Sequence, residues 1–507
     1  MAVAYGGSGA GDPGRVAPLR PRPSWRALGA SVVGRGTRER LRQLPPHWPI
    51  TVCIAGFPIW WALGLGALVW PVFAIPLGLR LITRRRRIVV PLGFGAWLLY
   101  LAFVVLSFTA LESSALPFAW IWRLANYLSC TVFFLAICAA DDDEIPADRI
   151  VRLLAGFWIV TVVGGWLGVL LPDGSIPSLT ERVLPASVAT NEFMQVLVRP
   201  EFAQVHDILG YPLGRPKAPF VYTNDWGSAY ALLLPFFFLS WLQSADIRRR
   251  SWAYLLLVAS LIPVFVSLNR GLWLSLGVAM VYAASRSGDL ARLARRALFA
   301  LLTIGLLLIV FTPVGTLVEG RAENDHSSAG RSLLYGEAFR ITTESPIIGL
   351  GGPRPYEGNK IIPNVGTQGM FWTVLVSTGY VGLGLFLAAW LRWIWETRAG
   401  PSVTFWCHVV LIIGLVQILV YDMIPSSLHV VFIAAALGFR AARRDGLASG
   451  ASRVTGGQTP DSASGASRVT GGQTPSDRLG TVGPGGHGRK VSDPGWSATA
   501  GPMGATS

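Results

Sequence analysis

The chain has 507 residues, of which 52% are hydrophobic and only 14% are charged, and its formal net charge is +15. This composition excludes an ordinary soluble globular protein and favours a multi-pass membrane protein. Nucleic acid is not expected as a partner, because the arginines cluster beside apolar runs, as topology signals do, and not on a polar domain.

The cysteines all lie within apolar runs, where they act as small hydrophobic residues; they are Cys53, Cys130, Cys138 and Cys407. Their spacing indicates neither a disulfide framework nor a zinc site. The sequence therefore predicts no metal and no cofactor.

Residues 1–47 are polar and rich in arginine, and they predict a disordered basic arm in the cytoplasm. No cleavage site follows this arm, so the first apolar run should remain as a membrane span. The run from Ile50 to Ile82 is too long for one helix, and Pro71 and the glycines near its middle predict two short spans folded as a hairpin.

About ten further apolar runs each predict a single span, and the charge of every connecting loop agrees with both termini in the cytoplasm. The expected fold is therefore an all-α multi-pass membrane protein with about twelve transmembrane helices. These later spans are predicted at 89–110, 117–139, 151–171, 228–242, 253–268, 272–284, 297–314, 370–390, 403–419 and 428–439.

Two long loops, 172–224 and 316–369, lie on the outer side in this topology, the second between spans nine and ten. Loops of this length are uncommon in a compact domain and are often functional. The second loop predicts an amphipathic helix over 331–343, which Ser345 and Pro346 end. Its apolar positions are Leu334, Ala338 and Ile341, and its polar positions are Glu337, Arg340 and Glu344.

Cationic side chains in or beside the spans are the main functional candidates. Arg123 lies inside a span, where a charged side chain is costly unless it pairs, binds an anion or reaches the interface. Arg215 and Lys217, held among prolines at the outer face, suit a phosphate group, with a solvated loop charge as the alternative. Arg270 lies in a short outer turn, against the positive-inside trend, which makes it the strongest single indication of function.

Three adjacent aspartates open the segment from Asp141 to Arg149, and they suggest Mg²⁺ ligation as one alternative. A solvated cytoplasmic turn is favoured, because adjacent residues do not share a helix face and no second acidic motif accompanies them.

The tail, 445–507, is rich in Gly, Ser, Thr and Pro and contains SGASRVTGGQTP twice. No apolar face exists on which such repeats could stack, so the tail should be disordered and cytoplasmic.

The order of several motifs resembles the O-antigen ligase and O-antigen polymerase superfamily of bacterial multi-pass membrane glycosyltransferases. The matching elements are Asn269-Arg270-Gly271 in a short outer turn, Gly330-Arg331 before an aliphatic helix, Pro346–Gly351 as a P-[IL]-[IL]-G-x-G turn, and Gly379–Leu383 as G-x-x-G-L. The resemblance covers about residues 48–444 and implies a GT-C-like helical bundle with the large outer loop described above.

The resemblance implies transfer of a glycan from an undecaprenyl-diphosphate carrier to an acceptor hydroxyl at the outer face of the cytoplasmic membrane, without metal or nucleotide sugar. The acceptor is another glycan or a different hydroxyl compound. A diphosphate leaving group requires fixed positive charge, which arginine supplies. We therefore expect Arg270 and Arg331 to be catalytic, with Arg215, Lys217 and Arg123 binding the lipid diphosphate.

This chain departs from the family at the position of a His-Asn pair, where it has Gln368 and Gly369. Glutamine cannot take a proton near neutral pH, so Gln368 is a candidate for the site but not for the general base. His326, Asp325 and Glu344 are possible substitutes in the same loop. The alternative functions are a transporter or flippase of lipid-linked glycans and a non-catalytic family member.

Overall fold

The computed structural model describes residues 44–84, 88–111, 116–185, 192–207, 212–286, 326–356, 364–398, 400 and 402–456. The chain divides into two units, Met1–Ala451 and Ser452–Ser507. Of the second unit the described residues are 452–456, which are helical. The predicted span at 297–314, residues 1–43 of the basic arm and most of the repetitive tail lie outside the described residues.

The first unit is mostly helical over its described residues and contains one small two-stranded antiparallel sheet. Its elements are α3 (Trp48–Ala55), α4 (Phe57–Ala62), α5 (Val69–Arg84), α6 (Gly93–Leu106), η1 (Ser107–Ala110), α7 (Leu116–Ala139), α8 (Ala147–Leu170), α9 (Leu179–Val183), α11 (Glu192–Val198), β1 (Ala203–Asp207), β2 (Pro212–Pro216), α12 (Thr223–Phe237), η2 (Phe238–Leu242), α13 (Ile247–Val266), α14 (Arg270–Ser285), α17 (His326–Thr342), α18 (Met370–Thr397), α19 (Ser402–Gln417) and α20 (Ser426–Gly456).

Five stretches of helix in the described residues are long and apolar enough to cross a membrane. They are Gly93–Ala110, Pro117–Ala139, Ala147–Leu170, Ile247–Val266 and Met370–Thr397. Each overlaps a predicted span, so the prediction of a helical membrane protein is confirmed at this level. The count of about twelve spans stays a prediction, because the remaining helices are shorter, less apolar or outside the described residues.

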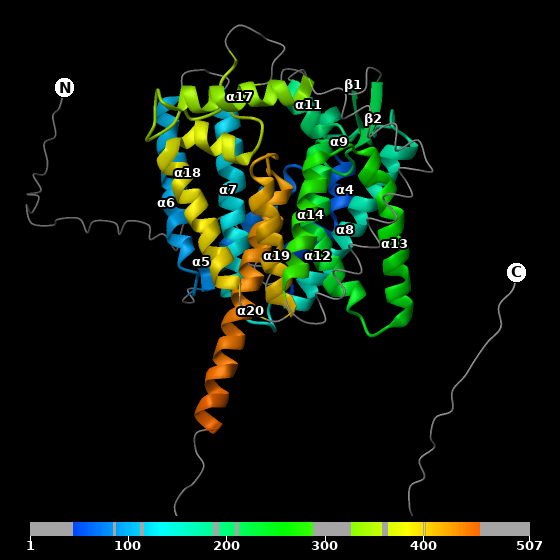
Figure 1. The fold of residues 1–507 in the computed structure, drawn as a ribbon, viewed down its shortest axis with the longest axis vertical. Coiled ribbons are helices and arrows are strands. Elements are labelled where there is room, and N and C mark those ends of the chain that lie inside the picture. The colour runs from blue at the N-terminus through cyan, green and yellow to red at the C-terminus, as the bar shows by residue number, and fades with distance from the viewer. Residues whose placement is uncertain are drawn as a thin grey trace, which may run out of the picture. The chain divides into compact units, whose positions relative to one another are not determined.

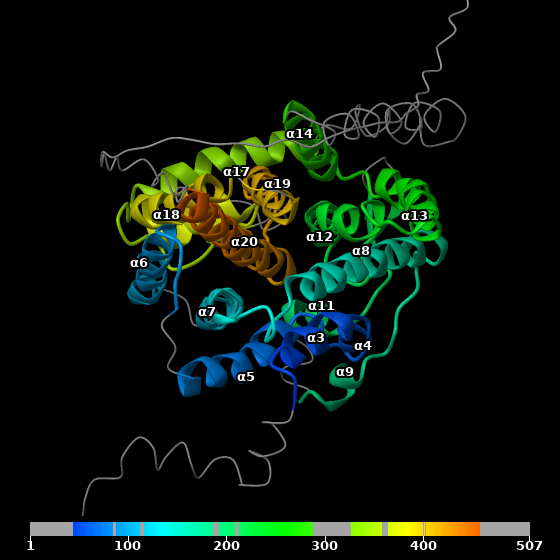
Figure 2. The ribbon, with the colours of Figure 1, turned by 90° about the horizontal axis from the view of Figure 1, so that it is seen from below.

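The long helices run side by side as a bundle (Figures 1 and 2). The closest neighbours are α6 with α18, α8 with α12, and α5 with α7. Large aromatic side chains fill the space between them, and the buried ones include Trp97, Trp158, Trp226 and Trp390. Their burial supplies much of the apolar area that holds the bundle together.

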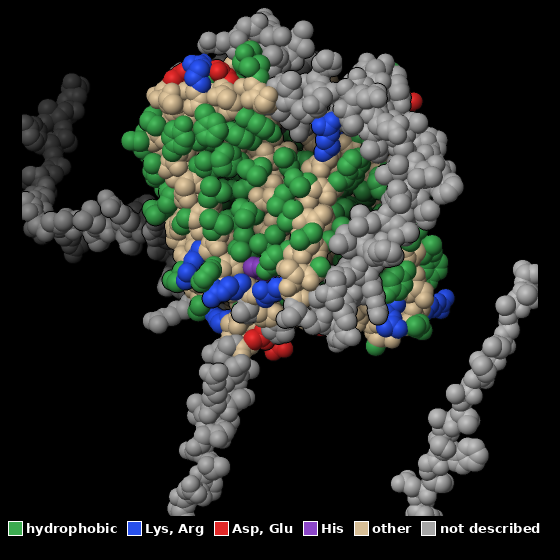
Figure 3. Space-filling model, in the orientation of Figure 1, with side chains coloured by type: hydrophobic (Ala, Val, Ile, Leu, Met, Phe, Trp, Pro, Cys, Tyr) green, Lys and Arg blue, Asp and Glu red, His purple; other side chains and the backbone are tan. Residues whose placement is uncertain are grey.

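The outer surface of the bundle carries large exposed apolar side chains, such as Ile75, Leu92 and Leu170, each more than half accessible. Figure 3 shows a wide hydrophobic band on one face of the molecule, and most charged side chains on this face lie above or below it. An exposed apolar band of this extent indicates contact with lipid.

The two ends of the bundle differ in their loops. The α9–β2 segment and α17 lie at the same end, which we call the loop end (Figure 1). The opposite end, which we call the arginine end, carries Arg84 paired with Glu144, and Arg440, 3.3 Å from a carboxylate oxygen of Asp142. The aspartate-rich segment therefore contributes an ion-pair partner to neighbouring helices.

The amphipathic helix predicted at 331–343 is present as α17, which lies across the loop end of the bundle (Figure 1). Its predicted apolar positions Leu334, Ala338 and Ile341 are all buried. Arg340, on the predicted polar side, is exposed and pairs with Glu337 at 2.6 Å. The helical period of the apolar residues therefore predicted correctly which face of α17 is buried against the bundle.

Candidate functional site

The strands β1 and β2 hold the first cationic candidates against the bundle. Gln204 pairs with Arg215 across the two strands. Arg215 is buried, and its Nε donates a hydrogen bond to the backbone carbonyl of Ser267 at 2.6 Å. Lys217 is also buried, and its Nζ lies 2.5 Å from a carboxylate oxygen of Glu201. Arg215 therefore fastens β2 to the turn after α13, and Lys217 forms an ion pair within the segment that precedes α12.

Ser267 belongs to the short turn that carries Arg270. This turn connects α13 with α14, and Asn269 caps α14 by accepting a hydrogen bond from the backbone N–H of Leu272 at 3.4 Å. The side-chain amide of Asn269 also donates to the carbonyl of Thr223 at 3.3 Å, at the start of α12. Arg270 is the first residue of α14 and is exposed, at the loop end as predicted.

Tyr421 connects this turn to the start of α18. Its phenolic hydroxyl donates a hydrogen bond to the side-chain oxygen of Asn269, and its carbonyl accepts one from the N–H of Met370 at 2.7 Å. A Cβ atom on Gly271 would come 2.6 Å from the Tyr421 hydroxyl, so only glycine fits at this position of the motif. One buried residue, through its side chain and its backbone carbonyl, thus brings the Arg270 turn together with the residues that follow Gln368.

Gln368 is turned toward its own loop. Its Nε2 donates to the carbonyl of Asn364 at 2.9 Å, and its Oε1 accepts from the N–H of Gly366 at 3.2 Å. The neighbouring Gly369 lies against the carbonyl of Leu419, which a Cβ atom would approach to 2.8 Å. Gln368 therefore shapes the turn that leads into α18.

The glycine turn at 346–351 docks onto a break in α18. Gly379 has φ 70° and ψ −172°, which interrupts the helix and frees the carbonyls before it. The N–H groups of Leu350 and Gly351 donate to the carbonyls of Val376 and Ser377, at 2.8 and 3.1 Å. In return, the N–H of Tyr380 donates to the carbonyl of Pro346 at 2.8 Å. Two motifs that the sequence places far apart are therefore complementary surfaces of one joint.

Arg123 reaches this joint from α7. Its Nη2 donates to the carbonyl of Gly351 at 2.7 Å, and a Cβ atom on Gly352 would come 2.9 Å from the same nitrogen. Within the part of the chain that the structure describes, Arg123 makes no ion pair. Its remaining guanidinium donors therefore keep the capacity to bind an anion.

Arg354 is a cation that the sequence did not single out. Its Nη2 donates a hydrogen bond to the carbonyl of Ala110 at 3.4 Å.

Two aspartates missed by the sequence analysis lie between these groups. Asp422 follows Tyr421 and is accessible to solvent, yet burial by the surrounding protein raises the pKa of its carboxyl. Burial and the negative charge of Asp422 raise the pKa of Asp225, in the first turn of α12, well above its usual value. We call the group formed by Asp422 and the neighbours that its charge affects, Arg123, Tyr222 and Asp225, the central cluster.

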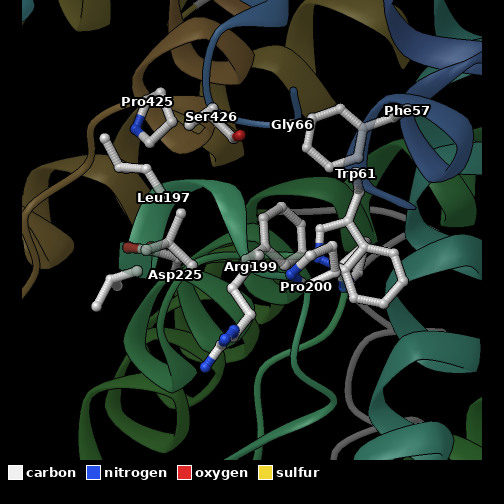
Figure 4. A pocket seen from close by; sticks show the side chains of 14 residues that line it. Phe57, Trp61, Gly66, Leu197, Arg199, Pro200, Asp225, Pro425 and Ser426 are labelled. Carbon is white, nitrogen blue, oxygen red and sulfur yellow. The ribbon is translucent and has the colours of Figure 1, made fainter. Parts of the chain in front are cut away.

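A hollow that opens to solvent and has an empty volume of about 400 Å³ is lined in part by Asp225 of the central cluster (Figure 4). Its walls include Phe57 and Trp61 from α4, Arg199 after α11, and Asp225. Pro425 and Ser426, a few residues beyond Asp422, form another part of the wall. None of the site residues predicted from the sequence lines it.

The remaining predicted residues lie on or before α17. Arg331 is inside the helix and His326 is its first residue, but their side chains, and all of Asp325, are outside the described part. Glu344 is exposed just after the helix and lies 3.5 Å from Nη1 of Arg340. The proposed roles of Arg331 and His326 therefore stay predictions.

Among the described residues no group of three or more His, Cys, Asp or Glu side chains is arranged to hold a metal ion. No protein-family model matches this chain, and no curated protein matches it. A function for this chain is therefore inferred from the geometry of the loop end.

Proposed function

We propose that the protein is a membrane glycosyltransferase of the O-antigen ligase or polymerase type. It transfers a glycan from an undecaprenyl-diphosphate carrier to an acceptor hydroxyl at the outer face of a bacterial cytoplasmic membrane. In this proposal the loop end faces outward and both termini are cytoplasmic. The observation that carries it is the Tyr421 connection, which joins the Arg270 turn to the start of α18 directly after Gln368.

The charges at the loop end support a role for the arginines in stabilising the leaving group. The lipid diphosphate gains negative charge as its bond to the sugar breaks, and a fixed guanidinium in a site of low dielectric stabilises that charge. Arg270 is exposed on the anchored turn, and Arg123 has donors available beyond its bond to Gly351. These two arginines are the proposed diphosphate ligands, with Arg331 entering from α17.

The buried contacts of Arg215 and Lys217 give them a different role from the one expected. Arg215 holds the Ser267 carbonyl, and Lys217 holds Glu201. Both side chains then act as positioning residues that fix the Arg270 turn relative to β1 and β2. Transfer within a rigid frame is favoured because small displacements of reacting groups are costly.

The break in α18 is the one described feature that also suits a transporter, since broken helices often form transport sites. Its freed carbonyls at Val376 and Ser377 already accept hydrogen bonds from the 346–351 turn. They are therefore occupied by protein and not open to an ion or substrate, which favours the enzyme over the flippase.

The full-length protein in lipid vesicles provides the direct test. Lipid-linked glycan extracted from membranes of the native bacterium is the donor, and mass spectrometry follows glycosylated acceptor and free undecaprenyl diphosphate. We expect both products in the absence of added metal and nucleotide sugar. Movement of intact donor between leaflets without release of undecaprenyl diphosphate would establish the flippase and reject the enzyme.

Loss of the protein in cells gives a second measurement. Lipid-linked glycan should accumulate on the outer leaflet while the finished surface polymer disappears. Accumulation on the inner leaflet would contradict the proposal.

A further inference from the structure

The proposed reaction requires a group that takes the proton of the acceptor hydroxyl, and Gln368 cannot do so. His326 and Asp325 have no described side-chain geometry, and Glu344 is exposed just after α17, close to Arg340. Asp422, in contrast, follows directly after Tyr421 and is accessible to solvent. Its carboxylate is therefore the best placed described acid.

The surroundings of Asp422 come from several helices. Arg123 on α7 is close enough to interact with its charge, and Tyr127 on α7 and Tyr100 on α6 lie nearby. Tyr222 and Asp225, at the start of α12, are further neighbours. Asp422 thus has neighbours from α6, α7 and α12.

The surroundings of Asp422 act on the pKa of its carboxyl in opposite directions. Burial raises the pKa of its carboxyl, while the N–H groups of Ile424 and Met423 and the positive charge of Arg123 oppose that rise. A carboxylate with a raised proton affinity and a cation nearby is suited to general-base catalysis. Burial raises the pKa of the neighbouring Asp225 as well.

The hollow lined by Asp225 and Ser426 has the chemistry of a sugar site. Phe57, Trp61 and Phe220 provide aromatic surface, and Asp225 and Ser426 provide hydrogen-bonding groups. Figure 4 shows Asp225 on the side opposite Trp61. Apolar surface with a few polar groups is typical of small-molecule sites, and aromatic faces pack well against sugar rings.

We propose that Asp422 is the general base for the acceptor hydroxyl and that the acceptor is a sugar bound in the hollow between Trp61 and Asp225. This inference rests on the proposed function. The acceptor oxygen forms a bond to the anomeric carbon of the donor, and the bond from that carbon to the diphosphate oxygen breaks. The hydroxyl proton moves to a carboxylate oxygen of Asp422, and the electron pair of the broken bond stays on the diphosphate.

The test uses the full-length protein in vesicles with the extracted lipid-linked glycan as donor. Asp422→Asn keeps the shape of the side chain but cannot accept a proton, so kcat should fall about 10²- to 10⁴-fold while the KM for donor changes little. Asp422→Glu should retain more activity than Asp422→Asn. Asp173→Asn, at an exposed position of the 172–224 loop, is the matched control and should keep the wild-type kcat.

A pH profile separates catalysis from a structural role. The wild-type kcat should decline toward acidic pH as Asp422 becomes protonated, and this decline should be absent from the residual activity of Asp422→Asn. A wild-type kcat in Asp422→Asn, or an unchanged acidic decline, would overturn the role of Asp422 and leave the proposed function in place. A wild-type protein that transfers no glycan would overturn both.

Discussion

Gly349 and Gly379 lie backbone against backbone, although thirty positions separate them in the chain: a Cβ atom on Gly349 would come 2.5 Å from the nitrogen of Gly379. Both residues have positive φ, 76° and 70°. An L side chain at either position therefore meets both a steric clash and an unfavourable backbone conformation. The joint between the loop turn and α18 depends on glycine at both places.

Gly379→Ala should lower the free energy of unfolding by more than about 2 kcal/mol, because it combines backbone strain with a clash against the Pro346 carbonyl. Thermal unfolding of the purified protein would measure the loss. Gly384→Ala is the matched control, since it lies in the same helix with no atom within 4 Å of its Cβ position. That control should be neutral or slightly stabilising. Equal stability of the two variants would show that the joint is not required.

Tyr421→Phe removes the hydroxyl that holds Asn269 and leaves the packing of the ring. We expect a loss of about 1–3 kcal/mol in stability, as for other buried hydrogen bonds, and a fall in transfer rate of about tenfold or more because the Arg270 turn loses its anchor. Tyr230→Phe removes another buried hydrogen bond, the one between the hydroxyls of Tyr230 and Ser260, which lie 2.7 Å apart. It should lose similar stability but keep the transfer rate, and equal rates in the two variants would remove Tyr421 from the site.

Arg270→Ala should lower kcat by at least about 100-fold at normal protein levels, because the leaving diphosphate loses a fixed positive charge. Arg340→Ala, at the same end of the bundle, removes an exposed ion pair with Glu337 and should have little effect. Vesicle assays with the extracted donor give both rates. Unchanged transfer in Arg270→Ala would exclude this residue from the site.

Asp225→Asn tests the raised pKa of Asp225. A carboxyl whose pKa is higher in the folded state stabilises the protein at pH values below its unfolded pKa, and that stabilisation is lost as the pH rises through the folded pKa. Wild-type stability should therefore decrease from about pH 4 upward through the raised pKa, whereas Asp225→Asn should show a smaller decrease. Unfolding temperatures of the wild type and Asp225→Asn, measured across this pH range, test the prediction. The same pH dependence in both proteins would contradict it.

The sequence predicted the parts of the fold that depend on local periodicity. The buried face of α17, with Leu334, Ala338 and Ile341, follows from helical spacing alone. The five long apolar helices follow from the length of their hydrophobic runs. The placement of Arg270 at the loop end followed from counting the spans.

The sequence could not predict which charged side chains form hydrogen bonds or ion pairs with neighbouring residues. Arg215 and Lys217 looked open in a proline-rich loop, but their partners Ser267 and Glu201 become known only when the chain is folded. Asp422 is a single acid between two apolar runs, where loop residues of every kind occur. Its candidate role depends on the nearby charge of Arg123, about 300 positions earlier in the chain. No local sequence pattern reveals that these two residues lie close together.

Two contacts fasten the segment around α17 to the upper half of α18. Tyr335 stacks on Trp372 with ring centroids 4.2 Å apart, and the glycine joint closes the other side at Gly379. The helix and the half of α18 above its break are thereby clamped into one rigid block. Any opening of the loop end must carry this block as a whole, so spin labels at Arg340 and Phe371 should keep a constant separation while the distance from either to α13 changes.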